Sequence, residues 1–274
     1  MKVAAIIVAL ILLFSLCIWQ FALSPRDRML IFASKLQMKV GEQTRAFYVA
    51  PPANGSTPKR LFIGLHAYGD TPRRFGYYTG LHNVVESEDL VIYPQSVSPT
   101  SDQRSGWNAG FCCGSGWKQN VDDVEFLSRI AENFKQQYGE NAPVYVLGFS
   151  NGGMMTQRLL SEKPELFAGG VASGSAAGVI GNTLQPKSSD TPLLLMHGER
   201  DGTVLFTGGA STNEPDFPWL SFDETSAVWR GALGDKLQTK IYPELTHQWP
   251  DWRIFKVWHT KPAGTQEAVT FLNR

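Results

Sequence analysis

Hydrophobic positions along the chain alternate between short apolar runs and amphipathic stretches. The apolar runs predict strands at residues 46–50, 60–65, 90–94, 144–147, 169–172, 193–196 and 237–242. Apolar residues recur at helical spacing over 124–134 and again over 264–273. Short strands that alternate with helices predict an α/β fold, with a mostly parallel central sheet and helices on both faces. Ligands in such sheets bind at the carboxyl ends of the strands.

The 124–134 helix carries a start signal in front of its apolar positions. Asp122 and Glu125 have the spacing of a capping box, in which each side chain bonds the other residue's backbone N–H. We therefore expect the helix to begin beside Asp122.

The first residues form a separate segment. An apolar run extends from Val3 to Trp19, which is long for a signal peptide and short for a membrane span. No small-residue cleavage site follows it, so we expect residues 1–24 to be a signal or a membrane anchor and residues 25–274 to form one folded domain. Either role places the domain outside the cytoplasm, anchored or released into the periplasm or medium. One signal opposes export, because the positive-inside rule favours a cytoplasmic body when basic residues follow the span. Those residues are Arg26, Arg28, Lys35 and Lys39.

Composition and charge narrow the class of protein. The chain has 274 residues, of which 43% are hydrophobic and 18% charged, and its formal net charge is zero. This length and apolar content support one large domain with a full core. A neutral balance without a basic run argues against a nucleic-acid partner.

Ser150 has the strongest chemical signal in the chain. The apolar strand 144–147 leads into Gly148-Phe149-Ser150-Asn151-Gly152, a G-x-S-x-G turn, and an amphipathic helix follows. Such a turn holds the serine in a tight, exposed conformation and directs the N–H groups of the next helix toward the group it attacks. An ordinary turn with a helix-capping serine is the alternative, and the flanking strand and helix favour a nucleophile.

A serine nucleophile needs a base, and the base needs an orienting carboxylate. In sheets with such a turn, the acid follows the serine in the chain and the histidine follows the acid. The strand at 193–196 is followed by Asp201, the best candidate for the acid, with Glu199 as the runner-up. The alternative role for Asp201 is to shape the turn before Gly202.

Chain order also selects the histidine. Only His247 and His259 follow Asp201. His247 comes a short loop after the predicted strand 237–242, where this arrangement places its base, whereas His259 is expected to be an ordinary surface or core residue. The histidines that precede Asp201 are His66, His82 and His197.

The third requirement is a pair of N–H donors that stabilise an oxyanion. One is the N–H of Asn151, directly after the nucleophile, and the other comes from the loop after an early strand. The loop after strand 60–65 has that placement, and we expect its His66 to be structural.

Six segments follow one another along the chain, each matched by a motif given in parentheses: Leu65-His66-Ala67-Tyr68 (L-H-G-C), Trp107 to Gly114 (W-N-x-G-x-C-C-G), Val121 to Phe126 (V-D-D-V-x-F), Gly148 to Met155 (G-x-S-N-G-G-M-M), His197 to Asp201 (H-G-x-x-D) and His247 to Pro250 (H-x-W-P). In these motifs the chain resembles the polyhydroxybutyrate-depolymerase-like esterases, a group of α/β-hydrolases that includes family-1 carbohydrate esterases and feruloyl esterases. The resemblance extends from about Phe47 to the end of the chain. It implies a catalytic triad of Ser150, Asp201 and His247, with the N–H groups of Tyr68 and Asn151 as oxyanion donors.

Two departures from the group's pattern concern the oxyanion loop and the cysteines. Ala67 and Tyr68 stand where the group has glycine and cysteine, which weakens the assignment of that donor. A late cysteine of the group is also missing here. Cys112 and Cys113 therefore form either a vicinal disulfide or two reduced, buried thiols, and their spacing does not suit a zinc site.

The resemblance implies a serine carboxylic-ester hydrolase that works through an acyl-enzyme on small or oligomeric esters of hydroxyalkanoate, feruloyl or acetyl-sugar type. No metal or cofactor is expected. Trp107, Phe149 and Trp249 are candidates for substrate binding, with core packing as the alternative. A serine peptidase or thioesterase could use the same triad, and a non-catalytic binding protein is a third possibility.

Overall fold

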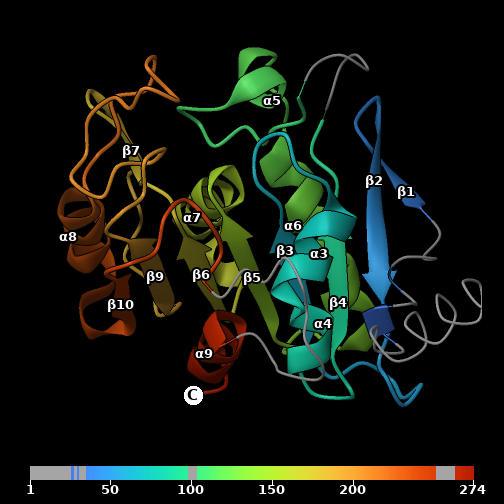
Figure 1. Ribbon diagram of the computed structural model, residues 1–274. Coiled ribbons are helices and arrows are strands. Elements are labelled where there is room, and N and C mark those ends of the chain that lie inside the picture. The colour runs from blue at the N-terminus through green and yellow to red at the C-terminus, as the bar shows by residue number, and fades with distance from the viewer. Residues whose placement is uncertain (1–25, 28–29, 31–34, 98–103, 251–262) are drawn as a thin grey trace, which may run out of the picture.

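The computed structural model describes residues 26–27, 30, 35–97, 104–250 and 263–274. An eight-stranded sheet runs through the described part of the molecule in the order β1-β2-β4-β3-β5-β6-β9-β10 (Figure 1). The strands from β4 to β10 pair in parallel, and β1 and β2 pair antiparallel at one edge. The strands are β1 (Leu36–Val40), β2 (Gln43–Ala50), β3 (Leu61–Leu65), β4 (Leu90–Pro94), β5 (Val144–Phe149), β6 (Gly169–Ser173), β9 (Leu193–Gly198) and β10 (Leu237–Tyr242).

Helices cover both faces of the sheet. Alternate residues of β5 face opposite sides: Val144 and Val146 join a core with α6, α7 and α8, whereas Tyr145 and Leu147 join a second core with α3, α4 and α9. This alternation follows from the period of two in a strand. The helices are α3 (Pro72–Thr79), α4 (Leu81–Val84), α5 (Gly114–Lys118), α6 (Asp123–Tyr138), α7 (Asn151–Glu162), α8 (Phe222–Leu233) and α9 (Ala263–Leu272), with short 3-10 turns at Pro164–Leu166 and Gly234–Lys236.

The predicted strands are all present, each within a few residues of its expected bounds. The prediction omitted β1, the helices α3, α4, α5 and α8, and the small hairpin of β7 (Gly178–Val179) and β8 (Asn182–Thr183). The expected capping box at α6 is only half formed: the Asp122 carboxylate accepts the Glu125 N–H at 2.9 Å. The Glu125 carboxylate instead accepts from Arg129 at 2.5 Å, an i,i+4 pair on the exposed face.

The N-terminal segment of residues 1–24, expected to be a signal or an anchor, lies outside the described residues. Among the helices that the structure does describe, none combines the length and apolar character needed to cross a bilayer.

Candidate active site

Ser150 occupies the turn between β5 and α7 in a backbone conformation that side chains rarely adopt. Its φ is 54° and its ψ is −123°, a region that costs on the order of 1–3 kcal/mol for a residue other than glycine. Its N–H donates to the Ser173 carbonyl at 2.9 Å, which ties the turn to β6. The strain is thus held by the sheet, and it projects the hydroxyl at the carboxyl edge.

The glycines around Ser150 permit a close approach of backbones. A methyl group at Gly148 would overlap the carbonyl of Gly152, and one at Gly152 would overlap the carbonyl of Leu65 at the end of β3. Only glycine fits at both positions. The start of α7 therefore lies directly against the loop that follows β3.

One hydrogen-bonded chain joins Ser150, His247 and Asp201. His247 Nε2 lies 3.0 Å from Ser150 Oγ, and His247 Nδ1 lies 2.7 Å from Asp201 Oδ2. The serine comes from the β5–α7 turn, the aspartate follows β9, and the histidine follows β10. These contacts span 97 and 46 residues of sequence, so the parallel sheet brings the three side chains together.

Asp201 is held by more partners than the histidine alone. Its Oδ1 accepts the backbone N–H groups of Thr203 and Val204, each at 2.9 Å. A second imidazole, His197 Nε2, lies 3.4 Å from Oδ2 and also 2.9 Å from the Val204 carbonyl. Sequence reasoning gave His197 no role beyond its place in a motif. The spacing of four residues between His197 and Asp201 is the feature of the sequence that could have indicated this contact.

These contacts keep the Asp201 carboxyl ionised. Burial by itself raises the pKa of this carboxyl, but hydrogen bonds from His197 and His247, together with their charges, outweigh it and lower the pKa to about 2. An ionised carboxylate at Oδ2 requires His247 Nδ1 to be the donor, which leaves Nε2 to accept the serine proton.

Glu199, the runner-up for the acid, is not part of this hydrogen-bonded chain. The Glu199 side chain is exposed, and its N–H donates to the Tyr242 carbonyl at 3.1 Å. His259 lies outside the described residues.

All three aromatic residues predicted to bind substrate, Trp107, Phe149 and Trp249, are buried in the core, which is the alternative that the sequence left open for them. Trp107 is 0% exposed and donates its indole N–H to the His66 carbonyl at 2.9 Å. Trp249 is 1% exposed, donates to Thr265 Oγ1 at 2.9 Å and packs edge-on against Phe75. With no free surface, neither indole is available to a ligand.

Phe149 and Trp249 hold the loop that carries His247. The Phe149 ring packs against the His247 ring with centroids 4.9 Å apart. Trp249, two residues after His247, fixes the end of that loop to α9 through Thr265, which in turn donates to the Thr79 carbonyl at 2.7 Å. The loop with His247 is thereby fastened on both sides.

The two backbone N–H groups predicted to stabilise an oxyanion, those of Tyr68 and Asn151, belong to segments that lie close together. Asn151 is the first residue of α7, where N–H groups lack partners within the helix. The N–H of Tyr68, in the loop after β3, has no hydrogen-bond partner among the described residues. The close contact of Gly152 with the carbonyls of Leu65 and His66 places both segments together.

His66 is a structural residue of this loop, as expected. It is 0% exposed, its Nδ1 lies 2.8 Å from the Ala67 carbonyl, and its Nε2 accepts the Ser96 N–H at 3.2 Å. Burial lowers the pKa of His66 to about 4, against the opposing effect of the Ala67 carbonyl. The neutral ring therefore braces the loop against the strand end at Ser96.

The Asn151 side chain ties the turn at Ser150 to the segment around Trp107. Its Oδ1 accepts the Trp107 N–H at 2.7 Å, and its Nδ2 donates to the Trp107 carbonyl at 3.0 Å. A further buried pair, Arg45 with Asp123, fixes the same segment, since Asp123 Oδ2 also accepts the Asn108 N–H at 2.7 Å. The segment around Trp107 is thus fixed to the turn that carries Ser150.

Cys112 and Cys113 form a vicinal disulfide in this structure, one of the two alternatives that the sequence left open. Cys112 Sγ lies 3.4 Å from Met154 Sδ, and the pair packs in a small apolar cluster beside Asn151. Among the described residues, no three histidine, cysteine, aspartate or glutamate side chains gather as a metal site.

Comparison with known proteins gives sequence relatives and structural neighbours, although no protein-family model matches the chain. A probable acetylxylan esterase A of Neosartorya fischeri is 32% identical over 224 residues, which are 80% of this chain and 58% of that protein. Feruloyl esterase B of Thermothelomyces thermophilus is 28% identical over 133 residues, 48% of this chain and 44% of that protein. The chain thus spans about half the length of these curated relatives.

A solved structure agrees with the sheet and its helices. The acetyl xylan esterase from Aspergillus awamori superposes with a TM-score of 0.57 at 16% identity, covering 78% of this chain and 94% of that one. The strand order, the strained serine turn and this likeness assign the chain to the α/β-hydrolase fold. The relatives it resembles in sequence are acetylxylan and feruloyl esterases.

Proposed function

We propose that the protein is a serine carboxylic-ester hydrolase with Ser150 as nucleophile, His247 as general base and Asp201 as the orienting acid. The observation that carries this proposal is the continuous chain from Ser150 Oγ through both ring nitrogens of His247 to Asp201 Oδ2, with contacts of 3.0 Å and 2.7 Å. Nucleophile, base and orienter within hydrogen-bond reach are the signature of covalent acyl transfer.

The mechanism follows from the atoms that meet at this site. His247 Nε2 takes the Ser150 proton as Oγ attacks the ester carbonyl, and the Asp201 carboxylate stabilises the imidazolium. The N–H groups of Tyr68 and Asn151 hold the oxyanion, each contributing about 3 kcal/mol. The imidazolium then gives its proton to the departing alcohol, and a water activated by His247 releases the acid from Ser150.

The substrate class is inferred from the relatives' names. The relatives are named as an acetylxylan esterase and a feruloyl esterase, so we assign this site to acetyl or feruloyl esters of sugars. Hydroxyalkanoate oligomers are the second candidate. A thioesterase or peptidase remains an alternative because the triad alone does not select the leaving group.

A substrate panel tests the assignment. The purified protein is incubated with 4-nitrophenyl acetate, methyl ferulate, acetylated xylan, hydroxybutyrate trimer and a peptide 4-nitroanilide. We expect hydrolysis of 4-nitrophenyl acetate and acetylated xylan, and none of the anilide. Cleavage of the anilide at a rate equal to the esters would replace the esterase assignment with a peptidase.

The proposed site of action is outside the cytoplasm. The apolar run from Val3 to Trp19 supports export, because such a run directs a following domain across a membrane. We further propose that the protein stays attached to the membrane through this run. Release of the domain after cleavage is the alternative.

A further inference from the structure

His197, near the end of β9, contacts the proposed catalytic acid without being part of the chain from Ser150 to Asp201. Its Nε2 lies 3.4 Å from Asp201 Oδ2, the oxygen that pairs with His247, and 2.9 Å from the Val204 carbonyl. The residue is 2% exposed, so its ring meets the carboxylate from inside the protein. A buried imidazole against the orienting acid changes how strongly that acid acts on the base.

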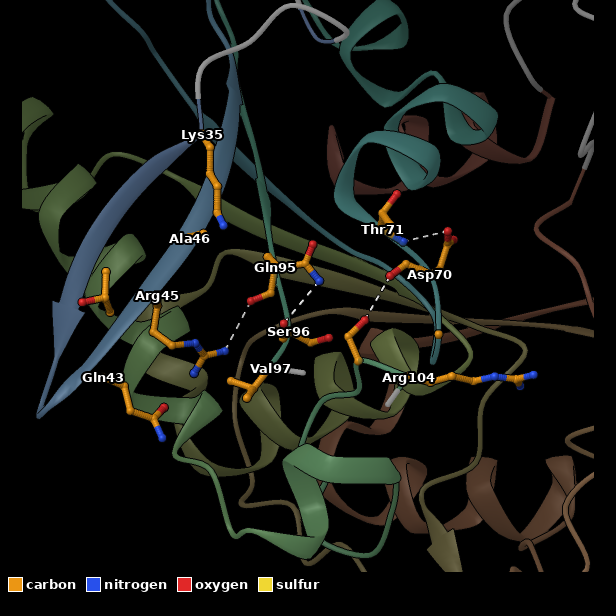
Figure 2. Close-up of a pocket in the computed structure, with 13 residues that line it drawn as sticks. Lys35, Gln43, Arg45, Ala46, Asp70, Thr71, Gln95, Ser96, Val97 and Arg104 are labelled. Carbon is orange, nitrogen blue, oxygen red and sulfur yellow. Dashed lines mark hydrogen bonds between the residues drawn. The ribbon is translucent and has the colours of Figure 1, made fainter. Parts of the chain in front are cut away.

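The surroundings of His197 separate it from any bound ligand. The rings of Phe206 and Phe222 pack edge-on against it, with centroids 5.8 Å and 5.6 Å away. Figure 2 shows a cavity of about 780 Å³ that is lined from β2, the loop after β3 and the segment after β4. Those strands lie on one side of β5, whereas β9 is two places away on the other side. His197 can therefore influence the reaction through Asp201 but not by touching a substrate.

Two neighbours determine where the His197 ring carries its proton. The Val204 carbonyl can only accept, so the Nε2 that lies 2.9 Å from it is protonated. Nδ1 is buried and has no hydrogen-bond partner among the described residues, so a proton there would be an unsatisfied donor. The geometry thus favours a neutral ring with its N–H at Nε2. That N–H lies beside the carboxylate oxygen that pairs with His247.

Val204 joins His197 and Asp201 into one closed unit. Its N–H donates to Asp201 Oδ1 at 2.9 Å, while its carbonyl accepts from His197 Nε2. The loop after β9 is therefore fastened at both backbone groups of Val204, and the same contacts orient the carboxylate. Loss of the imidazole would leave a buried carbonyl without this partner next to the acid.

Among the described residues, the charged groups that face the two imidazoles are Asp201, which contacts both rings, and Glu214. Burial raises the pKa of Glu214, and the charges of Arg104 and His247 oppose that rise. A change confined to His197 leaves this carboxyl as it is. The other charged groups on the neighbouring segments are exposed: Asp223 and Glu224 in the first turn of α8, and the surface pair of Arg200 with Glu244.

We propose that His197 is a positioning residue of the catalytic chain, whose Nε2–H holds the Asp201 carboxylate in place and competes with His247 for the charge on Oδ2. The proposal rests on the function given above and adds a residue to its machinery. A carboxylate oxygen shared between two N–H groups stabilises an imidazolium less than one that faces His247 alone. His197 thereby keeps His247 able to accept the serine proton at lower pH.

The pH dependence of kcat/KM for 4-nitrophenyl acetate tests this role, because its acid limb reports the protonation of the base in the free enzyme. Wild-type protein is compared with three variants between pH 5 and pH 9. His197→Phe keeps a ring of similar size but has no N–H, whereas His197→Gln keeps a donor close to the position of Nε2. His82→Phe is the matched control, because His82 in α4 is also a buried imidazole, with Nε2 3.0 Å from buried Asp27 Oδ1.

We expect His197→Phe to lower kcat/KM about tenfold and to move the acid limb by about half a pH unit or more toward higher pH. His197→Gln should recover most of the rate and return the limb toward the wild-type position. His82→Phe should lower thermal stability without moving the limb. An unmoved limb in His197→Phe, or an equal shift in His197→Gln or His82→Phe, overturns the proposal.

Nitrogen-15 NMR of the imidazoles in the wild-type protein is a second test, which does not depend on the folding of His197→Phe. At pH 8 it distinguishes the two neutral tautomers, and the His197 signals are identified by their loss in His197→Gln. We expect the proton at Nε2, and a proton at Nδ1 overturns the proposal. A protein with this tautomer but no turnover of 4-nitrophenyl acetate refutes the esterase and not the contact, whereas turnover with an unmoved limb refutes the role of His197 alone.

Discussion

At the scale of single residues, the proposed catalytic centre depends on one imidazole held from two sides. Asp201 fixes its Nδ1 at 2.7 Å, and the Phe149 ring packs against its face. Ser150 then lies 3.0 Å from the remaining nitrogen. This arrangement selects the His247 tautomer whose Nε2 can accept a proton. Substitutions of Ser150, His247 and Asp201 should therefore lower activity for different reasons.

The histidine assignment is tested by comparing His247→Ala with His259→Ala. Loss of His247 removes the base and should lower kcat about a thousandfold or more, whereas His259→Ala should retain wild-type activity. Steady-state hydrolysis of 4-nitrophenyl acetate measures both. If His259→Ala were the inactive variant, the base would be misassigned.

The acid assignment is tested by the pair Asp201→Asn and Glu199→Gln. The amide favours the wrong tautomer of His247, so kcat for 4-nitrophenyl acetate should fall by on the order of 10⁴. Exposed Glu199 should be replaceable without loss. Equal losses in the two variants would show that the loop, and not one carboxylate, matters.

Asp201 also makes the stability of the fold depend on pH. Its pKa is lowered from 3.8 to about 2 in the folded protein, so its ionised form stabilises the fold above pH 3.8, and this contribution is lost as the pH falls toward 2. The difference in unfolding free energy between the wild type and Asp201→Asn should therefore be constant above pH 5 and shrink below pH 4. Urea unfolding at pH 6 and pH 2.5 measures it, and an unchanged difference would contradict the lowered pKa.

At the scale of elements, the site depends on how closely α7 approaches β3. Gly152 permits this approach because its Cα lies against the Leu65 and His66 carbonyls. The same contact sets the distance between the two proposed oxyanion donors, on Tyr68 and Asn151. Close packing of these two backbone segments thus positions the two proposed N–H donors, which no side chain could place by itself.

Gly152→Ala should disturb this contact, with Gly231→Ala as the matched control. A methyl group at Gly152 meets backbone, so we expect a loss of about 1–3 kcal/mol of stability and about a hundredfold of kcat/KM. Gly231 is a helical glycine in α8 with no atom within 4 Å of an added Cβ, so its alanine variant should be slightly more stable. Thermal unfolding and ester hydrolysis measure both, and normal activity in Gly152→Ala would contradict the packing argument.

At the scale of the whole molecule, the parallel sheet and the order of serine, acid and histidine follow from sequence pattern. A buried apolar run such as 144–147 predicts a strand of a parallel sheet once a turn and a helix follow it in the sequence. The sequence does not show β1, whose Leu36–Val40 pattern is mostly exposed, or α3, whose arginines interrupt the apolar positions.

Long-range contacts are the part that pattern cannot supply. The Arg45–Asp123 pair joins residues 78 positions apart, and nothing in either segment specifies the other. Trp107 and Trp249 show a second limit, because an aromatic residue near a catalytic motif can face the core as readily as the cleft. The direction in which the Trp249 side chain points is set by neighbours such as Thr265, and these neighbours are known only from the fold.

Export is the prediction that concerns the full chain. Cells expressing it should carry the domain outside the cytoplasm, either as a full-length membrane protein digestible from the outer side or as a shorter soluble form. Fractionation with added protease distinguishes these results. A domain protected on the cytoplasmic side would contradict export. It would instead agree with the positive-inside rule applied to the basic residues Arg26 and Arg28.

The most direct test of the central claim is the rate of ester hydrolysis by Ser150→Ala. Serine and alanine differ by one oxygen, and the fold should remain intact by circular dichroism and thermal unfolding. We predict that the wild-type protein hydrolyses 4-nitrophenyl acetate and that the variant retains less than about 0.1% of its kcat. A folded Ser150→Ala protein with more than about 1% of wild-type activity would contradict the account.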